Sequence, residues 1–121
     1  MSDFAVWLDS EKAQIFNLKT TGIEKSHLER GGADPKSHSS AEHFFHELAL
    51  KLKNANHILL MGPGLAKNHF KTHLEKHHHE GIAKKIIGVE NSDHPTDNQI
   101  LATVRKFFVK YDLFNSPIIP G

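Results

Sequence analysis

The stretch that decides the fold is residues 58–67, ILLMGPGLAK. With His57 before it, its first half is an almost wholly apolar run that ends at Met61, as expected for a central strand buried on both faces of a sheet. Gly62, Pro63 and Gly64 then predict a tight turn. A helix is expected over residues 65–78, because apolar side chains recur there at helical spacing. The stretch therefore predicts a strand–turn–helix unit of an α/β protein.

The residues before this unit predict a small antiparallel sheet. Residues 4–8 and 13–18 are short apolar runs separated by a charged turn, which is typical of a hairpin. Residues 22–28 alternate apolar and polar side chains and predict a third strand at a sheet edge. Residues 29–39 are polar, contain glycine and proline, and predict a flexible loop.

Two capping boxes organise the helical part of the chain. Ser39 and Glu42 are spaced to open a helix, and Thr96 and Gln99 are spaced to open another that runs to about Tyr111. Residues 82–89 contain a third buried strand, and residues 113–121 predict an extended tail. The expected order is β-β-β-α-β-α-β-α, a ribonuclease H-like mixed sheet in a single domain over residues 1–121.

The amino-acid composition excludes several kinds of site and partner. The chain has 121 residues, of which 38% are hydrophobic and 24% charged, a globular balance. No cysteine is present, which excludes disulfides, thiolate metal sites and a cysteine nucleophile. No signal-like or membrane-spanning run is apparent, so a cytoplasmic protein without a membrane partner is expected. The net charge of +1 argues against a strong nonspecific nucleic-acid binder, and DNA is not an expected partner.

The order of elements and two motifs resemble the middle domain of eukaryotic and archaeal release factors and Pelota. The chain resembles more closely the small bacterial single-domain relatives called translational machinery proteins. The resemblance extends from Phe4 to Phe108. It is carried by residues 6–9 (VWLD), 13–16 (AQIF), 62–67 (GPGLAK), 89–90 (VE) and 93–100 (DHPTDNQI).

This resemblance implies a noncatalytic, ribosome- or RNA-associated role in release, rescue or hibernation, without a cofactor. Release factors carry a Gly-Gly-Gln motif in the loop, whose glutamine assists ester hydrolysis. Here Gly31 and Gly32 are followed by Ala33, which cannot orient water. Pelota-like members also lack the motif and act in rescue without hydrolysis. The loop has a family-like basic content, which makes Arg30 and Lys36, with the two glycines, candidates for RNA contact.

The glycine turn has two interpretations. Gly62 and Gly64 could expose backbone N–H groups at the positive end of a helix dipole, with Lys67 adding a charge for an RNA phosphate. They could equally form only the tight turn that packing requires. Asp93, His94 and Thr96 follow the next strand and would share this edge of the sheet. Thr96 is expected above all to cap the last helix.

The chain contains eleven histidines, and three of them share a helical stripe. His69, His73 and His77 follow at i, i+4 and i+8, a spacing at which two imidazoles can share a zinc ion. No HExxH pattern is present, and neighbouring lysines would repel a cation. A solvated, weakly basic face without a metal is the simpler interpretation.

Two other functional classes stay open. A ribonuclease H-type nuclease needs converging carboxylates, for which Asp9 and either Glu42 or Glu47 are candidates. No acid follows Met61, where another ligand is expected, and a peptidyl-tRNA hydrolase is disfavoured by Ala33. The third class is a homo-oligomeric interaction module that uses an edge strand or the apolar tail.

Overall fold

The computed structural model describes residues 3–19, 22–30, 40–77, 81–93 and 95–115, with side-chain surroundings through residue 108. Its elements follow in chain order: β1 (Asp3–Leu8), β2 (Lys12–Lys19), β3 (Gly22–Glu29), α1 (Ala41–Lys51), β4 (His57–Gly62), α2 (Ala66–His77), the short 3-10 helix η1 (Ile82–Lys85), β5 (Ile86–Asn91) and α3 (Asp97–Asn115).

The five strands form one mixed sheet in the order β3-β2-β1-β4-β5. β1, β2 and β3 form an antiparallel meander, whereas β4 runs parallel to β1, and β5 runs parallel to β4. This arrangement confirms the predicted ribonuclease H-like fold. The stretch that begins at Ile58 provides the strand next to β1, near the middle of the sheet.

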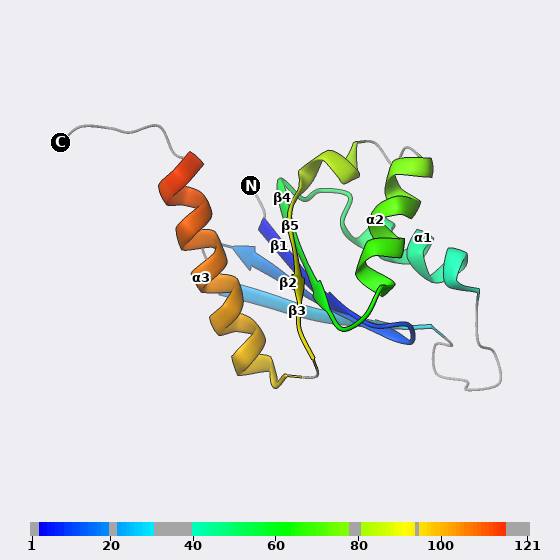
Figure 1. Cartoon of the computed structure of the whole chain (residues 1–121), viewed down its shortest axis with the longest axis horizontal. Coiled ribbons are helices and arrows are strands. Elements are labelled where there is room, and N and C mark those ends of the chain that lie inside the picture. The colour runs from blue at the N-terminus through cyan, green and yellow to red at the C-terminus, as the bar shows by residue number, and fades with distance from the viewer. Residues whose placement is uncertain (1–2, 20–21, 31–39, 78–80, 94, 116–121) are drawn as a thin grey trace.

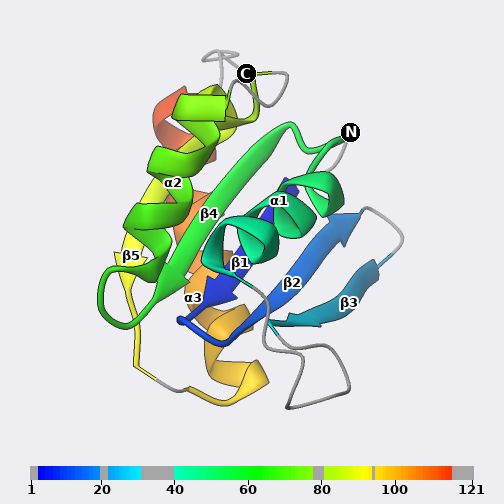
Figure 2. The same cartoon turned by 90° about the vertical axis from the view of Figure 1, so that its right-hand side faces the viewer.

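Helices cover both faces of the sheet. α1 and α2 lie on one face and α3 lies on the other (Figures 1 and 2). Alternate residues of β1 point to opposite sides: Phe4, Val6 and Leu8 join the core under α1 and α2, while Ala5 and Trp7 join the core under α3. Because both faces are covered, β1 and β4 are continuous apolar runs with no polar alternation.

The two outer strands differ from the central ones in burial. Residues 22–27 of β3 are exposed, which confirms the predicted edge strand. β5 was expected to be buried, but its residues are only half-buried or exposed. β5 is the opposite edge of the sheet, so its outer side has no neighbouring strand among the described residues.

Two predicted boundaries need correction. Ser40, not Ser39, caps α1: its hydroxyl accepts a hydrogen bond from the His43 backbone N–H at 3.1 Å. Ser39 itself lies outside the described residues. α3 continues through Asn115, so the predicted extended tail is helical in its first three residues. Part of the predicted loop, residues 31–39, also lies outside the described residues.

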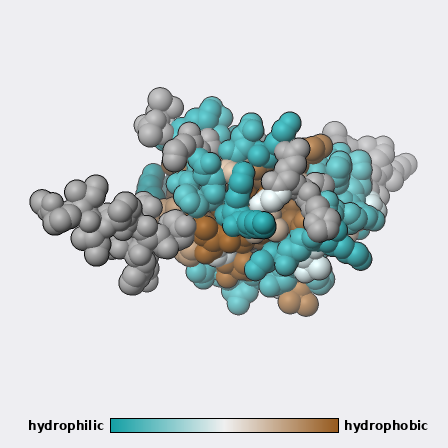
Figure 3. Space-filling view, turned by 90° about the horizontal axis from the view of Figure 1, so that it is seen from above, coloured by the Kyte–Doolittle hydropathy of each residue, from teal (hydrophilic) through white to brown (hydrophobic). Residues whose placement is uncertain are grey.

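In the described part of the chain, no helix is long and apolar enough to cross a membrane. Seen from above, the molecule is mostly hydrophilic, with a compact group of hydrophobic residues near the middle of that view (Figure 3).

Candidate binding surfaces at the carboxyl edge and beside α1

The parallel strands β1, β4 and β5 end at the same side of the sheet, where α2 and α3 begin (Figure 2). We call this side the carboxyl edge, comprising residues 9–12, Arg30, residues 62–65, residues 91–93 and residues 95–97. Gly62 pairs with Asn91, and the Ser92 backbone N–H donates to the Gly62 carbonyl at 3.1 Å. The glycine turn and the segment after β5 are therefore neighbours, as the sequence predicted.

The backbone conformation and the close packing against β1 both require a glycine at position 62. Its φ is +146°, a conformation that side chains rarely adopt, and a Cβ there would lie 2.0 Å from the Leu8 carbonyl oxygen. Gly64 also has a positive φ, +61°, but a Cβ at Gly64 would meet no described atom within 4 Å. The first glycine thus lets β4 leave the sheet directly against β1, and the second only turns the chain.

Lys67 does not present its charge at the surface. Its side chain is 2% exposed, and its Nζ donates a hydrogen bond to the Gly64 carbonyl at 2.5 Å. The ammonium therefore ties the first turn of α2 to the glycine turn. Leu65, immediately before α2, is 65% exposed. This arrangement favours the structural interpretation of Lys67 over the phosphate-binding one.

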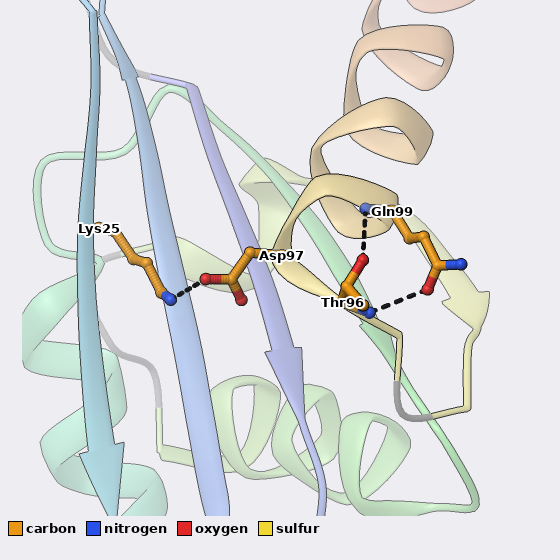
Figure 4. Close-up of polar contacts among 4 residues, drawn as sticks. All are labelled: Lys25, Thr96, Asp97 and Gln99. Carbon is orange, nitrogen blue, oxygen red and sulfur yellow. Dashed lines mark hydrogen bonds and ion pairs between the residues drawn. The ribbon is translucent and has the colours of Figure 1, made fainter.

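Further hydrogen bonds and one ion pair hold the segment after β5 and the start of α3. The Trp7 indole N–H donates to the Asp93 carbonyl at 2.8 Å. Thr96 and Gln99 form the predicted capping box, with the Thr96 backbone N–H on Gln99 Oε1 at 2.9 Å and the Gln99 N–H on Thr96 Oγ1 at 3.3 Å. Asp97 forms an ion pair with Lys25 of β3 (Figure 4). Thr96 is thus the cap of α3.

The remaining described side chains of the carboxyl edge carry mixed charge. Asp9 accepts backbone hydrogen bonds from Glu11 and Lys12 through Oδ1, which makes it a turn residue. Arg30 donates to the Ser10 carbonyl at 3.4 Å. Carboxylates are at least as numerous as cations here. Four predicted RNA-contact residues, Gly31, Gly32, Lys36 and His94, lie outside the described residues.

A second surface was not predicted from the sequence. A groove of about 490 Å³ separates the C-terminal end of α1 from β2 and β3, and we call it the lysine groove. Lys19 pairs with Glu24 at 2.7 Å, and Lys25 pairs with Asp97. Lys51 and Lys53 form no ion pair with any described residue. The lining residues are Phe4, Ile15, Asn17, Lys19, Glu24, Lys25, Ser26, Leu50, Lys51, Lys53 and Asn54.

Polar groups extend into the floor of the lysine groove. Ile15, Asn17 and Lys19 alternate along β2, so they share the sheet face that α1 covers. Asn17 Oδ1 is buried without a hydrogen-bond partner among the described residues. The signal in the sequence is the change from apolar Ile15 to polar residues at every second position, where the core ends.

The histidine stripe is split by the fold. His73 and His77 line a pocket of about 530 Å³ between α1 and α2, together with His43 and His46 of α1, whereas His69 is exposed and outside it. His73 is only 9% exposed, so the expected solvated face is wrong at this position. Within the described ranges, no three histidine or carboxylate groups already stand in a metal-binding arrangement.

The carboxylates considered for a nuclease lie on two elements: Asp9 is in the turn after β1, and Glu42 and Glu47 are both on α1. Asp9 lies at the carboxyl edge, Glu42 lies 3.4 Å from His77 of α2, and Glu47 lies 2.8 Å from His43. Met61 and Gly62, where another acid would be needed, are buried. The described residues therefore do not bring these acids together.

The fold is that of one part of the Pelota and release-factor proteins. The Pelota protein of Thermoplasma acidophilum matches with a TM-score of 0.67 and 23% identity, over 87% of this chain and 32% of that one. Archaeoglobus fulgidus Pelota matches with a TM-score of 0.68 and 21% identity, over 89% of this chain and 32% of that one. Dom34 of S. cerevisiae, described as a translation termination-like factor involved in RNA quality control, matches with a TM-score of 0.63 and 13% identity. The match covers 93% of this chain and 34% of Dom34.

These similarities are similarities of fold. They confirm the resemblance to Pelota and the release factors at the level of the fold. The chain spans about a third of the length of each of these structures. No protein-family model matches the sequence, and no curated protein matches it.

Proposed function

We propose that this chain is a noncatalytic binding domain of the translation machinery that contacts ribosomal or other RNA. The observation that carries this proposal is the lysine groove, where Lys51 and Lys53 stand beside amide and hydroxyl side chains. Cations of this kind bind phosphates without reading sequence, and amide groups can hydrogen-bond the edges of unstacked bases.

The fold likeness supports the same class of function. Structures of similar fold include Dom34, a translation termination-like factor, and an archaeal translation termination factor. In our proposal the carboxyl edge supplies a secondary contact through Arg30 and the loop that follows it. Lys67 and Thr96 act there as structural residues, because their polar groups already bond the protein itself.

The test is co-sedimentation of the chain with ribosomes over a series of salt concentrations. Reversal of two charges in K51E/K53E should weaken binding and flatten its dependence on salt, because each lost phosphate contact removes about one unit from the slope against log salt. The matched control is R105E/K106E, which reverses two exposed charges on α3, on the other face of the sheet.

Three outcomes count against the proposal. The first is no co-sedimentation of the wild-type chain at low salt. The second is an equal loss in K51E/K53E and R105E/K106E, which would reflect net charge alone. The third is clear turnover of peptidyl-tRNA, which would make the domain an enzyme.

A second candidate function is self-association through β3. Six consecutive residues of this edge strand are exposed, and Ile23 is 40% exposed. An exposed strand edge can pair with a second copy. Sizing chromatography at several concentrations tests this, with I23K as the variant that should shift any dimer to monomer. A wild-type chain that elutes as a monomer throughout excludes it.

A further inference from the structure

The pocket between α1 and α2 gathers side chains that the proposed function does not use. Its lining residues are Ser40, Glu42, His43, His46, His73 and His77. Four of these six are histidines, one is a carboxylate, and none is a lysine or arginine. Neutral imidazole and carboxylate are the ligands that zinc and related divalent ions take in proteins without cysteine.

The distance between His77 and Glu42 fits a shared metal better than a direct hydrogen bond. His77 Nε2 lies 3.4 Å from Glu42 Oε1. Charge-assisted hydrogen bonds are shorter, about 2.7–2.9 Å. Ligand atoms about 2.0–2.2 Å from a tetrahedral ion stand roughly 3.4 Å from each other. These two atoms, from different helices, therefore already have the spacing of two ligands.

His73 supplies the third donor. It precedes His77 by one helical turn, and the two ring centroids are 4.5 Å apart. The His73 ring also packs on Phe45 at 5.6 Å, which restricts its orientation. The three groups do not yet converge, so binding requires a rotation of side chains. His43, whose Nε2 lies 2.8 Å from Glu47, is near enough to the pocket to serve as a further ligand.

The fold also removes the electrostatic objection to a cation. The lysines of α2 were expected to repel a metal, but Lys67 is buried against Gly64, and neither Lys71 nor Lys76 lines the pocket. We propose that His73, His77 and Glu42 bind a divalent transition-metal ion, with zinc as the probe, and that this ion links α1 to α2.

Zinc titration of the untagged, full-length chain against a chromophoric chelator tests the site. Wild-type protein should bind one zinc ion at micromolar or lower concentration. H77A and E42Q should each weaken binding by more than about tenfold, the loss typical even of groups that only support a ligand. H69A is the matched control, because His69 is an exposed histidine of the same helix outside the pocket, and it should bind like wild type.

A second readout separates loss of a ligand from loss of fold. His77 and Glu42 side chains are 41% and 72% exposed, so both variants should keep the wild-type urea midpoint without metal. Zinc should raise the thermal midpoint of wild type and H69A but not of H77A or E42Q.

Several results would overturn the site. Zinc affinity unchanged in H77A and E42Q excludes it, as does an equal loss in H69A. Loss of zinc in H78A/H79A with retention in H77A would assign the ion to other histidines. Binding that reaches only millimolar affinity and is altered by no single variant would mean an adventitious ion only.

Discussion

Gly62→Ala tests the close approach on which the carboxyl edge depends. The new Cβ would lie 2.0 Å from the Leu8 carbonyl oxygen, whereas real Cβ atoms essentially never come within 3.0 Å of such an atom. β1 and β4 would therefore have to separate by about 1 Å at this point. We expect the Ala side chain to strain the backbone as well, because φ is +146°.

The magnitude follows from these two effects. A residue held in such a conformation costs about 1–3 kcal/mol. Separation of the strands weakens one or two ladder hydrogen bonds, each worth about 1 kcal/mol. We expect a loss of about 2–5 kcal/mol in the free energy of unfolding, a large share of the roughly 5–15 kcal/mol typical of a domain.

Gly64→Ala is the matched control, because it adds the same methyl group two residues later in open space. Its cost should be only the left-handed strain of about 1–2 kcal/mol. The assay is urea unfolding followed by circular dichroism and Trp7 fluorescence. A loss in Gly62→Ala no greater than in Gly64→Ala would refute the reasoning.

Three further changes test the contacts of α3 and β5. Thr96→Ala should cost about 1 kcal/mol in urea unfolding, because it removes a capping box, whereas Asn98→Ala on the exposed face should cost little. Trp7→Phe should cost about 1–2 kcal/mol, since it leaves the carbonyl after β5 without its indole donor. Gly88→Ala should cost about 1–3 kcal/mol, because its Cβ would lie 2.5 Å from the Phe107 ring. Adding Phe107→Leu to the Gly88→Ala chain should restore part of the lost stability. A double variant no more stable than Gly88→Ala would contradict this account.

The element order could be predicted because each signal is local. The apolar run before Gly62 fixes a strand covered on both faces, and the Thr96–Gln99 spacing fixes the start of α3. The start of α1 was misplaced by one residue because two adjacent serines offer the same hydroxyl, and only the backbone geometry selects Ser40.

The burial of individual side chains could not be predicted in the same way. Lys67 is charged, yet it is buried, and its ammonium donates a hydrogen bond to the Gly64 carbonyl. His73 is buried because α1 packs against α2 with Phe45 at the contact. The half-burial of β5 follows from its position in the sheet, which no local pattern encodes.

The three candidate sites differ in how far the sequence predicts them. The proximity of Gly62 to the segment after β5 follows from parallel strands, so it was predictable. The lysine groove and the histidine pocket each join helix residues to positions far away in the sequence. Lys51 lines the same groove as residues of β2, and Glu42 lies beside His77. Both proximities can be predicted only when the packing of the helices is known.

The pairing of β1 with β4 has a consequence for how the chain folds during its synthesis. The hairpin and meander of β1, β2 and β3 use neighbours in the sequence, so they can form once about the first thirty residues are free. The other side of β1 pairs Asp3 with His57, a separation of 54 residues. This loop must close before the centre of the sheet exists, so its closure should limit the folding rate. Until then, the apolar edge of β1 stays open to other chains, which makes nascent forms that end before β4 the ones most prone to aggregate.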